Sequence, residues 1–278
     1  MAERSTPVAL TIATSDSGGG AGIQADLKAF ARCGVHGMTA ITALTAQSTV
    51  GVTGVHPVPG EFIVDQVRAV AEDIGVDAVK IGMLGTAEIV AAVERALDLI
   101  APGTPVVIDP VMVSESGAVL LDDDARRVLA DTLLPRATVI TPNLPEARVL
   151  AGADPPDDVA ELARVLHALG PDVVVVTGGH REQATDVLFD GDGIHLIEGE
   201  RHRDGAAHGS GCTHSSALAA GLALGRSPLE AARAARAIAA AAVRDGLRDI
   251  GRGPGPVDVL GLTTGAAGRG YDAQAAGV

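Results

Sequence analysis

Apolar runs rich in valine and isoleucine alternate along the chain with stretches in which apolar residues recur every three or four positions. The runs predict strands at residues 8–14, 38–44, 78–81, 105–109, 138–141 and 173–177, because β-branched side chains favour a pleated backbone. The periodic stretches predict helices at residues 23–33, 61–73, 87–100, 123–133, 144–150, 159–169, 213–224 and 229–247. This alternation predicts an α/β fold with a mainly parallel central sheet and helices on both faces.

The remaining segments predict an edge hairpin, a single domain and two irregular chain ends. Two short apolar runs, residues 187–189 and 194–197, flank Asp190-Gly191-Asp192-Gly193 and predict a β-hairpin at one edge of the sheet. No repeat or low-complexity linker divides residues 8–260, so we expect a single domain there. Residues 1–7 and 261–278 lack periodicity, and we expect a flexible N-terminus and a disordered C-terminal tail.

Charge and cysteine content narrow the possible partners. The chain has 278 residues, with 21 Lys and Arg against 35 Asp and Glu, which gives a net charge of −14. Such a surface repels phosphate backbones, so a nucleic-acid partner is disfavoured. No apolar segment approaches the length of a membrane span or resembles a secretory leader, and only two cysteines occur, Cys33 and Cys212. We therefore expect a cytoplasmic protein with free thiols and no membrane contact.

A glycine loop before the small-residue helix at 213–224 is the first candidate for chemistry. Gly209, Ser210 and Gly211 can bring main-chain N–H groups close to a bound oxyanion at the positive end of that helix. Glycine loops also precede buried helices that bind nothing. Cys212 favours the functional interpretation, because a thiol at this helix end is expected to have a lowered pKa and to lie beside a transferring phosphate.

Polar residues also follow the first three predicted strands. The first strand is followed by the glycine loop Gly18-Gly19-Gly20. Beside this loop, Asp16 or Asp26 could accept a hydrogen bond from a substrate hydroxyl. A tight turn with a solvated Asp26 is an equal alternative. The spacing is not that of a dinucleotide fingerprint. After the second strand, Gln47 offers the donors and acceptor that complement a ring nitrogen beside an exocyclic amine. After the third, Met83 could pack against a ring, but core filling is its commoner role.

Carboxylates follow the later strands. Asp109 ends one strand, and Asn143 and Glu146 open the helix after the next. The spacing of Asn143 and Glu146 equally fits a capping box. Their position at the expected crevice suggests an Mg²⁺ site, because Mg²⁺ is held by one or two carboxylates, water and nucleotide phosphates.

These segments together resemble the bifunctional hydroxymethylpyrimidine/phosphomethylpyrimidine kinases of thiamine biosynthesis, a branch of the ribokinase-like fold. The resemblance covers about residues 8–258 and is specific because eight strings match in register. The strings are Ala9-Leu10-Thr11-Ile12-Ala13 with residues 19–28, Thr45-Ala46-Gln47, Lys80-Ile81-Gly82-Met83-Leu84, Asp109-Pro110-Val111-Met112, Thr141-Pro142-Asn143-Leu144-Pro145-Glu146-Ala147, Gly178-Gly179-His180 and His208-Gly209-Ser210-Gly211-Cys212-Thr213.

The resemblance implies an ATP- and Mg²⁺-dependent kinase that phosphorylates 4-amino-5-hydroxymethyl-2-methylpyrimidine twice. It assigns the aminopyrimidine edge to Gln47 and the hydroxymethyl group to the neighbourhood of Asp26. Further residues receive roles by the same resemblance: Ala21, Met83 and Val111 enclose the ring, Cys212 takes the place of the catalytic base of sugar kinases, Gly209, Ser210 and Gly211 form the anion hole, Asn143, Thr177 and Gly179 bind the nucleotide, and Glu146 and Asp109 hold the metal.

The chain departs from the family pattern mainly on the nucleotide side. Thr177 stands where a lysine is usual, Ala206 and Ala207 replace a polar pair, Arg252 replaces a lysine, and Thr14 replaces a glycine. Losing one charge-assisted phosphate contact costs roughly 1.5–3 kcal/mol, which raises the nucleotide Kd by one to two powers of ten.

Two other functions stay open at this point. A pyridoxal kinase of the same fold also phosphorylates a hydroxymethyl group on a flat ring, but Gln47 favours the aminopyrimidine. A non-catalytic pyrimidine-binding or regulatory protein is conceivable, because the nucleotide side has lost polar groups. The expected partners are the small-molecule pyrimidine, ATP and a second copy of the chain in a homodimer or higher homo-oligomer.

Overall fold

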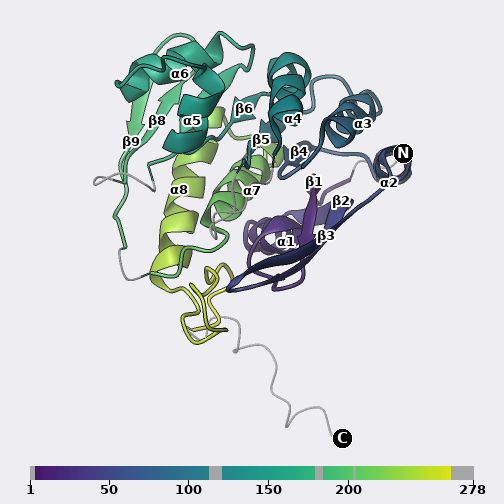
Figure 1. Cartoon of the computed structure of the whole chain (residues 1–278), viewed down its shortest axis with the longest axis horizontal. Helices are drawn as coiled ribbons and strands as arrows, with labels where there is room; N and C mark the ends of the chain where they lie inside the picture. Colours follow the sequence, from purple (N-terminus) through teal and green to yellow (C-terminus); the bar gives the residue numbers. More distant parts are fainter. Residues whose placement is uncertain (1–3, 113–120, 179–183, 203–204, 264–278) are drawn as a thin grey trace, which may run out of the picture.

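A computed structural model describes residues 4–112, 121–178, 184–202 and 205–263 of the chain. They form one nine-stranded sheet between two layers of helices (Figure 1). The strand order is β3-β2-β1-β4-β5-β6-β7-β8-β9. The strands are β1 (Val8–Asp16), β2 (His36–Ser48), β3 (Gly51–Pro57), β4 (Ala78–Ile81), β5 (Val106–Ile108), β6 (Val139–Ile140), β7 (Val173–Val176), β8 (Asp186–Phe189) and β9 (Ile194–Ile197).

The sheet confirms the predicted fold class. Six strands, β1, β2 and β4 to β7, run parallel, while β3, β8 and β9 are antiparallel to their neighbours. The hairpin of β8 and β9 lies at one edge, as predicted. Strand β3, at the other edge, was not predicted. It contains Gly51, Gly54 and Pro57 and is largely exposed, so its composition and burial pattern both lack the usual strand signal.

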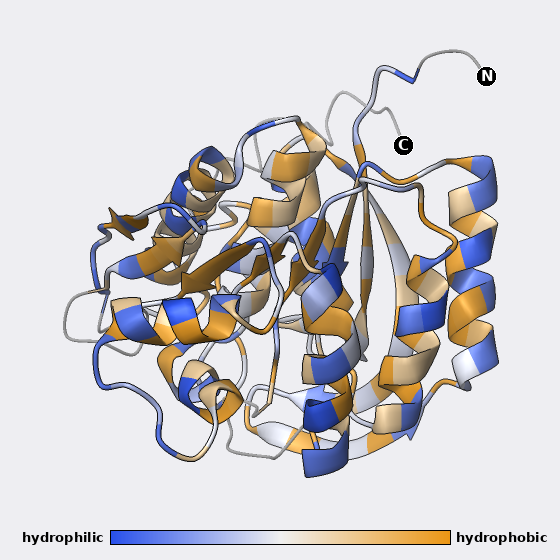
Figure 2. Cartoon of the chain, turned by 90° about the horizontal axis from the view of Figure 1, so that it is seen from above, coloured by the Kyte–Doolittle hydropathy of each residue, from blue (hydrophilic) through white to orange (hydrophobic). Residues whose placement is uncertain are grey.

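The helices cover both faces of the sheet. They are α1 (Gly22–Arg32), α2 (Gly60–Asp73), α3 (Ala87–Leu97), α4 (Asp123–Val128), α5 (Leu144–Ala151), α6 (Val159–His167), α7 (Ser210–Ala223) and α8 (Pro228–Arg244). Every predicted helix is present, although the one expected at residues 123–133 is α4 followed by a π-helical turn, η1 (Leu129–Leu133). Figure 2 shows largely apolar strands flanked by helices with polar and apolar stripes.

Side-chain alternation along the strands divides the core into two layers. Ala9, Ala78 and Val107 belong to a cluster with residues of α1, α7 and α8. The residues that follow Ala9 and Ala78 in the chain, Leu10 and Val79, belong to a second cluster with α2, α3 and α6. The β1, β4 and β5 side chains that point toward α7 therefore share one face, and polar residues in this set converge on one region.

The strand order reverses direction at β1. From β1 the chain passes to β2 on one side, and later strands are added through β4 on the other side. In open parallel sheets, ligands bind in the crevice beyond the carboxyl ends of the strands at such a switch point. The residues that follow β1, β4 and β5 are therefore positioned by topology to form a site.

The termini are only partly described. Near the N-terminus, Arg4 forms an ion pair with Asp77, and the carbonyl oxygen of Pro7 accepts from the N–H of His36 at 2.9 Å. Residues 264–278, at the C-terminus, lie outside the described residues. No helix in the described ranges is both long and apolar enough to cross a membrane.

Candidate active site

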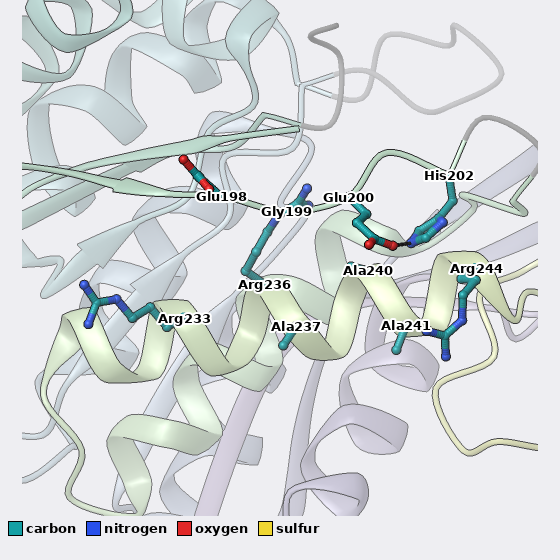
Figure 3. A pocket seen from close by; sticks show the side chains of 10 residues that line it. All are labelled: Glu198, Gly199, Glu200, His202, Arg233, Arg236, Ala237, Ala240, Ala241 and Arg244. Atoms are coloured by element: carbon teal, nitrogen blue, oxygen red, sulfur yellow. Dashed lines mark ion pairs between the residues drawn. The ribbon is translucent and has the colours of Figure 1, made fainter. Parts of the chain in front are cut away.

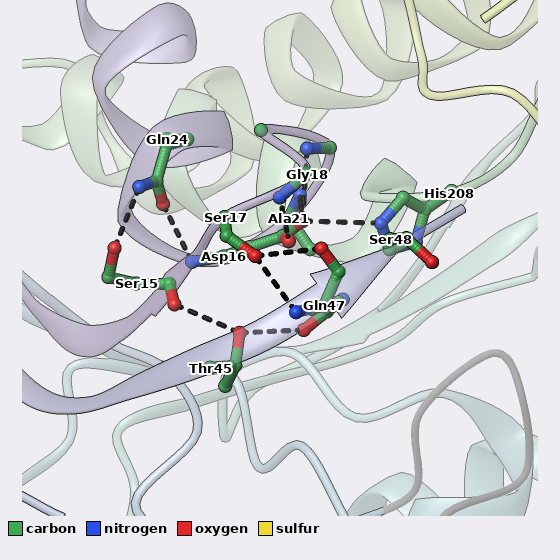
Figure 4. A network of polar contacts seen from close by, with 12 residues as sticks. Ser15, Asp16, Ser17, Gly18, Ala21, Gln24, Thr45, Gln47, Ser48 and His208 are labelled. Atoms are coloured by element: carbon green, nitrogen blue, oxygen red, sulfur yellow. Dashed lines mark hydrogen bonds and ion pairs between the residues drawn. The ribbon is translucent and has the colours of Figure 1, made fainter. Parts of the chain in front are cut away.

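The carboxylate of Asp16 organises the loop after β1 (Figure 4). Its Oδ1 accepts from the N–H of Gly18 at 2.7 Å, and its Oδ2 accepts from the N–H groups of Gly20 at 3.0 Å and Ala21 at 2.8 Å. Burial works to raise the pKa of Asp16, but the hydrogen bonds from His208 and from the loop outweigh it and hold that pKa below its ordinary value. Asp16 is thus an ionised residue that shapes the loop, and its oxygens already accept from the chain itself.

Gln47 lies against the same loop from the end of β2. The hydroxyl of Ser17 donates to the carbonyl oxygen of Gln47 at 2.7 Å and accepts from its N–H at 2.8 Å. The hydroxyl of Thr45 donates to Oε1 of Gln47 at 3.1 Å, while Nε2 has no partner in the part of the chain described (Figure 4). The half-buried amide therefore keeps two donors and one acceptor lone pair for a ligand.

The loop after β1 closes against the segment that precedes α7. His208 Nε2 lies 3.4 Å from Asp16 Oδ2. A Cβ on Gly20 would lie 2.2 Å from the His208 ring, and a Cβ on Gly209, whose φ is +86°, would lie 1.8 Å from the carbonyl oxygen of Gly20. The two loops can meet only because glycine occupies both positions. Sequence reasoning gave His208 no role, although its place directly before the glycine loop was a usable signal.

The first turn of α7 carries the predicted anion hole. The N–H of Ser210 donates to Ala207 at 2.9 Å, and that of Thr213 donates to Gly209 at 2.9 Å. The N–H groups of Gly211 and Cys212 find no acceptor within the described ranges, as expected at the start of a helix. If an oxyanion binds here, these two N–H groups are the donors left for it, and the N–H of Ser210 is already engaged.

The pKa of Cys212 differs from the sequence prediction. Burial, together with repulsion from Asp26 and Asp109, raises this pKa to about 12, although Lys80 and the N–H of Gly22 oppose the rise. The prediction of a lowered pKa at the helix end was therefore wrong, because desolvation and two nearby carboxylates outweigh the helix dipole. The thiol is protonated at neutral pH.

Asp26 is buried among side chains of β1, β4 and α7. Its side chain is 0% exposed, and Oδ2 accepts from the hydroxyl of Thr11 at 2.6 Å. Oδ1 accepts from Ser216 at 2.7 Å and from the ammonium of Lys80 at 3.0 Å. The alternative of a solvated Asp26 is contradicted, because this carboxylate is enclosed by other side chains. Its place near the hydroxymethyl group stays a prediction. Lys80 itself was missed, although a lysine within an apolar strand is an unusual feature.

Asp109 and Glu146 form a pair of buried carboxylates. They are 5% and 7% exposed. Burial and repulsion from Asp109 raise the pKa of Glu146 to about 8, and burial is also the main cause that raises the pKa of Asp109. A divalent cation would remove this repulsion, so the donor set suits Mg²⁺. No group of three or more His, Cys, Asp or Glu side chains gathers as a metal site within the described ranges, but Mg²⁺ needs only one or two carboxylates when phosphates and water complete its shell.

Both carboxylates are held by the chain. Ser215 of α7 donates to Oδ2 of Asp109 at 3.0 Å. Oε2 of Glu146 accepts from the N–H of Asn143 at 2.9 Å, and Oδ1 of Asn143 accepts from the N–H of Glu146 at 2.9 Å. The capping box is therefore real. Its presence does not compete with metal binding, because each carboxylate oxygen has more than one lone pair.

The predicted nucleotide-side residues lie beside each other as far as they are described. Asn143 and Thr177 form an isolated parallel bridge, and the N–H of Thr177 donates to Pro142 at 2.9 Å. The next residue, Gly178, donates its N–H to buried Asp186 at 2.7 Å. Gly179 lies outside the described residues.

The three residues predicted to enclose the ring are partly accessible. Ala21, Met83 and Val111 are all half-buried. Met83 follows β4, and its sulfur lies 3.8 Å from the hydroxyl of Thr14, the residue that replaces a glycine of the family pattern. They therefore lie outside the closed core, where a bound ring could contact them.

A separate pocket of about 230 Å³ lies between the segment after β9 and helix α8 (Figure 3). Its lining carries charges of both signs, with Glu198 and Glu200 on the segment and Arg233, Arg236 and Arg244 on the helix. It contains none of the residues predicted for the active site, so it is distinct from the candidate site described above.

The chain is similar in sequence and structure to known vitamin kinases. The phosphomethylpyrimidine kinase family model matches residues 16–258. A hydroxymethylpyrimidine/phosphomethylpyrimidine kinase of Rhizobium meliloti is 48% identical over 258 residues, which cover 91% of this chain and 96% of that protein. A bifunctional thiamine biosynthesis protein of Geobacter sulfurreducens is 47% identical over 253 residues, which cover 90% of this chain and 51% of that protein. The crystal structure of an ADP complex of Bacillus subtilis pyridoxal kinase has a TM-score of 0.83 and 39% identity, and it covers 94% of this chain and 100% of that chain.

Proposed function

The chain belongs to the phosphomethylpyrimidine kinase family, and from that premise we propose that it phosphorylates 4-amino-5-hydroxymethyl-2-methylpyrimidine with ATP and then phosphorylates the monophosphate. It is a kinase, and the names of its relatives connect the reaction with thiamine biosynthesis. The observation that carries the proposal is the meeting, at one switch point, of the Asp16 loop, the first turn of α7 and the Asp109–Glu146 pair.

Substrate recognition in this proposal rests on Gln47. Its free Nε2 can donate to a ring nitrogen while Oε1 accepts from the exocyclic amine. Met83, Val111 and Ala21 are exposed enough to contact the ring. An aminopyrimidine satisfies both ends of the amide, which pyridoxal cannot do because it has no amino group.

Phosphoryl transfer requires mainly positioning and charge stabilisation. The hydroxymethyl oxygen forms a bond to the γ-phosphorus, the bond from that phosphorus to ADP breaks, and the hydroxyl proton passes to an oxygen of the transferred phosphoryl group. The N–H groups of Gly211 and Cys212 would donate to the transferred group. Asp109 and Glu146 would hold Mg²⁺, which supplies neutralisation of the nucleotide phosphates. Because the Cys212 thiol is protonated at neutral pH, it is poorly suited to remove the hydroxyl proton in advance. The second transfer needs no base, since a phosphate oxyanion is the nucleophile.

A pyridoxal kinase is the second candidate. It is supported by the 0.83 TM-score and full coverage of the Bacillus subtilis pyridoxal kinase. That enzyme is 39% identical to this chain, against 48% for the Rhizobium meliloti pyrimidine kinase. Identity and Gln47 thus favour the pyrimidine.

The two candidates are separated by one comparison. Purified protein with ATP and Mg²⁺ is given either the pyrimidine alcohol or pyridoxal, and ADP and phosphorylated product are measured together. We expect a higher kcat/KM for the pyrimidine alcohol. A higher kcat/KM for pyridoxal would reverse the assignment. If neither compound is phosphorylated, a non-catalytic pyrimidine-binding protein would explain the chain better.

We further propose a cytoplasmic homo-oligomer. The two cysteines are free, which suits a reducing compartment. Leu44, Val50 and Val55, on or between β2 and the edge strand β3, are each roughly half exposed and could meet a second copy. Sedimentation of the wild type and of Val55→Lys tests this, since a monomeric wild type would contradict it.

A further inference from the structure

Lys80 is a fully buried ammonium at the centre of the sheet. It lies on β4, in register with Thr11 of β1 and Val107 of β5. Residues in register share a face of the sheet, so Lys80 points toward α1 and α7. Its side chain is 0% exposed. An isolated charge at this depth would be strongly disfavoured, so its surroundings must compensate it.

Asp26 supplies one part of that compensation. Nζ of Lys80 lies 3.0 Å and 3.1 Å from the two carboxylate oxygens of Asp26. Thr11 and Ser216 donate to the same carboxylate, so Asp26 is fixed from three directions. Buried ion pairs often contribute no more stability than apolar residues of similar size. Stability alone therefore does not account for this pair.

The active site lies on the other side of the ammonium. A Cβ on Gly82, which directly follows β4, would lie 2.7 Å from Nζ, so the ammonium extends along the strand toward its carboxyl end. Burial works to lower the pKa of Lys80, but attraction to the carboxylates of Asp26 and Asp109 helps to raise that pKa above its ordinary value. Lys80 is thus charged, and one of the carboxylates that stabilise its charge, Asp109, belongs to the proposed site.

Helix α7 connects the two sides. Ser215 donates to Asp109, and the next residue, Ser216, donates to Asp26. Consecutive helix residues point about 100° apart, so the pair reaches one carboxylate on each side. The ammonium, the two carboxylates, Ser215 and Ser216 form one connected buried cluster.

We propose that Lys80 is a positioning residue that provides a fixed positive charge beneath Asp109 and Cys212, in addition to its role as the partner of Asp26. The inference rests on the proposed kinase function. During transfer, negative charge gathers beside the first turn of α7, and a preorganised cation in a dry site stabilises it without rearrangement. Without the ammonium, Asp26 would instead add its negative charge to this region.

The competing explanation is that Lys80 only balances Asp26, and a pair of variants separates the two. Asp26→Asn removes the carboxylate charge and leaves the ammonium with Asp109 as its remaining charged partner, whereas Asp26→Asn/Lys80→Met removes both charges. We expect the double variant to regain most of the melting temperature that Lys80→Met alone loses, because no charge is left unpaired. Its kcat should stay about 10–100-fold below that of Asp26→Asn, the usual cost of losing an outer-shell partner, with little change in KM for the pyrimidine.

Recovery of kcat together with melting temperature in the double variant would overturn the proposal. If that variant does not fold, Asp26→Asn/Lys80→Gln takes its place, because glutamine keeps hydrogen bonding without charge. If neither double variant folds, the ion pair is a requirement for folding, and the separate role of Lys80 is rejected. Ser216→Ala is the matched control, since it removes one hydrogen bond to Asp26 but no charge and should lower the melting temperature with little effect on kcat. An inactive wild type would refute the kinase function itself, which is a different result from any of these.

Discussion

Replacing Glu146 by Gln tests the metal role of the buried carboxylate pair. The carboxyl has a pKa of about 8 in the folded protein, against an ordinary value of 4.5. Between these values the folded state binds more protons than the unfolded state, so the contribution of Glu146 to stability falls as the pH rises. Glu146→Gln removes this term but keeps an oxygen that can accept from the N–H of Asn143.

The size of the effect follows from the pKa difference. Relative to pH 4.5, the stability of the metal-free variant should rise against that of the wild type by about 3 kcal/mol at pH 7 and about 4 kcal/mol at pH 9. Mg²⁺ should act in the opposite direction, because a ligand at 100 times its Kd stabilises the wild type by about 2.7 kcal/mol and the variant would bind it poorly.

Urea unfolding at pH 5, 7 and 9, with a chelator and then with Mg²⁺, measures both effects. We also expect a large loss of kcat and a raised Mg²⁺ requirement. A variant that is less stable than the wild type at every pH, with its residual activity and Mg²⁺ dependence unchanged, would show that Glu146 serves only as the helix cap.

Three further substitutions test the remaining roles. Gln47→Leu should lower kcat/KM for the aminopyrimidine by one or more powers of ten, because each unsatisfied ring atom costs roughly 1–3 kcal/mol. Any pyridoxal activity should fall less, and equal losses for both substrates would show that Gln47 does not recognise the aminopyrimidine. Cys212→Ser should retain the first phosphorylation to within about tenfold, since the thiol is already protonated; a loss of 10²–10⁴ confined to that step is what a general base would give. Thr177→Lys should lower the KM for ATP and leave that for the pyrimidine unchanged; an unaltered KM for ATP would mean that another group supplies the charge.

The fold was accessible from sequence because its signals are local. Buried parallel strands are continuous apolar runs, and β4 (Ala78–Ile81) was predicted with its observed bounds. Strand β3 was missed because its glycines, proline and exposed side chains carry no such signal. The switch point then places the ends of β1, β4 and β5 together, so much of the site's location also follows from the pattern.

The electrostatics of the site could not be read from the chain. The pKa of Cys212 depends on Asp26 and Asp109, which approach it only in the folded structure. The enclosure of Asp26 depends on Lys80 and on Ser216, which lies 190 positions away along the chain. Residues that are distant in sequence determine how far each ionisable group is desolvated and which charges surround it. The hydrophobic pattern of the sequence does not reveal these contacts.

The central claim is most directly tested by the second transfer. The purified protein is incubated with ATP, Mg²⁺ and the pyrimidine monophosphate, and phosphorus NMR follows the products. The account predicts one ADP for each pyrimidine diphosphate, with two coupled phosphorus signals from the product. ATP left intact beside unchanged monophosphate, in a preparation that converts pyridoxal to its phosphate, would contradict it.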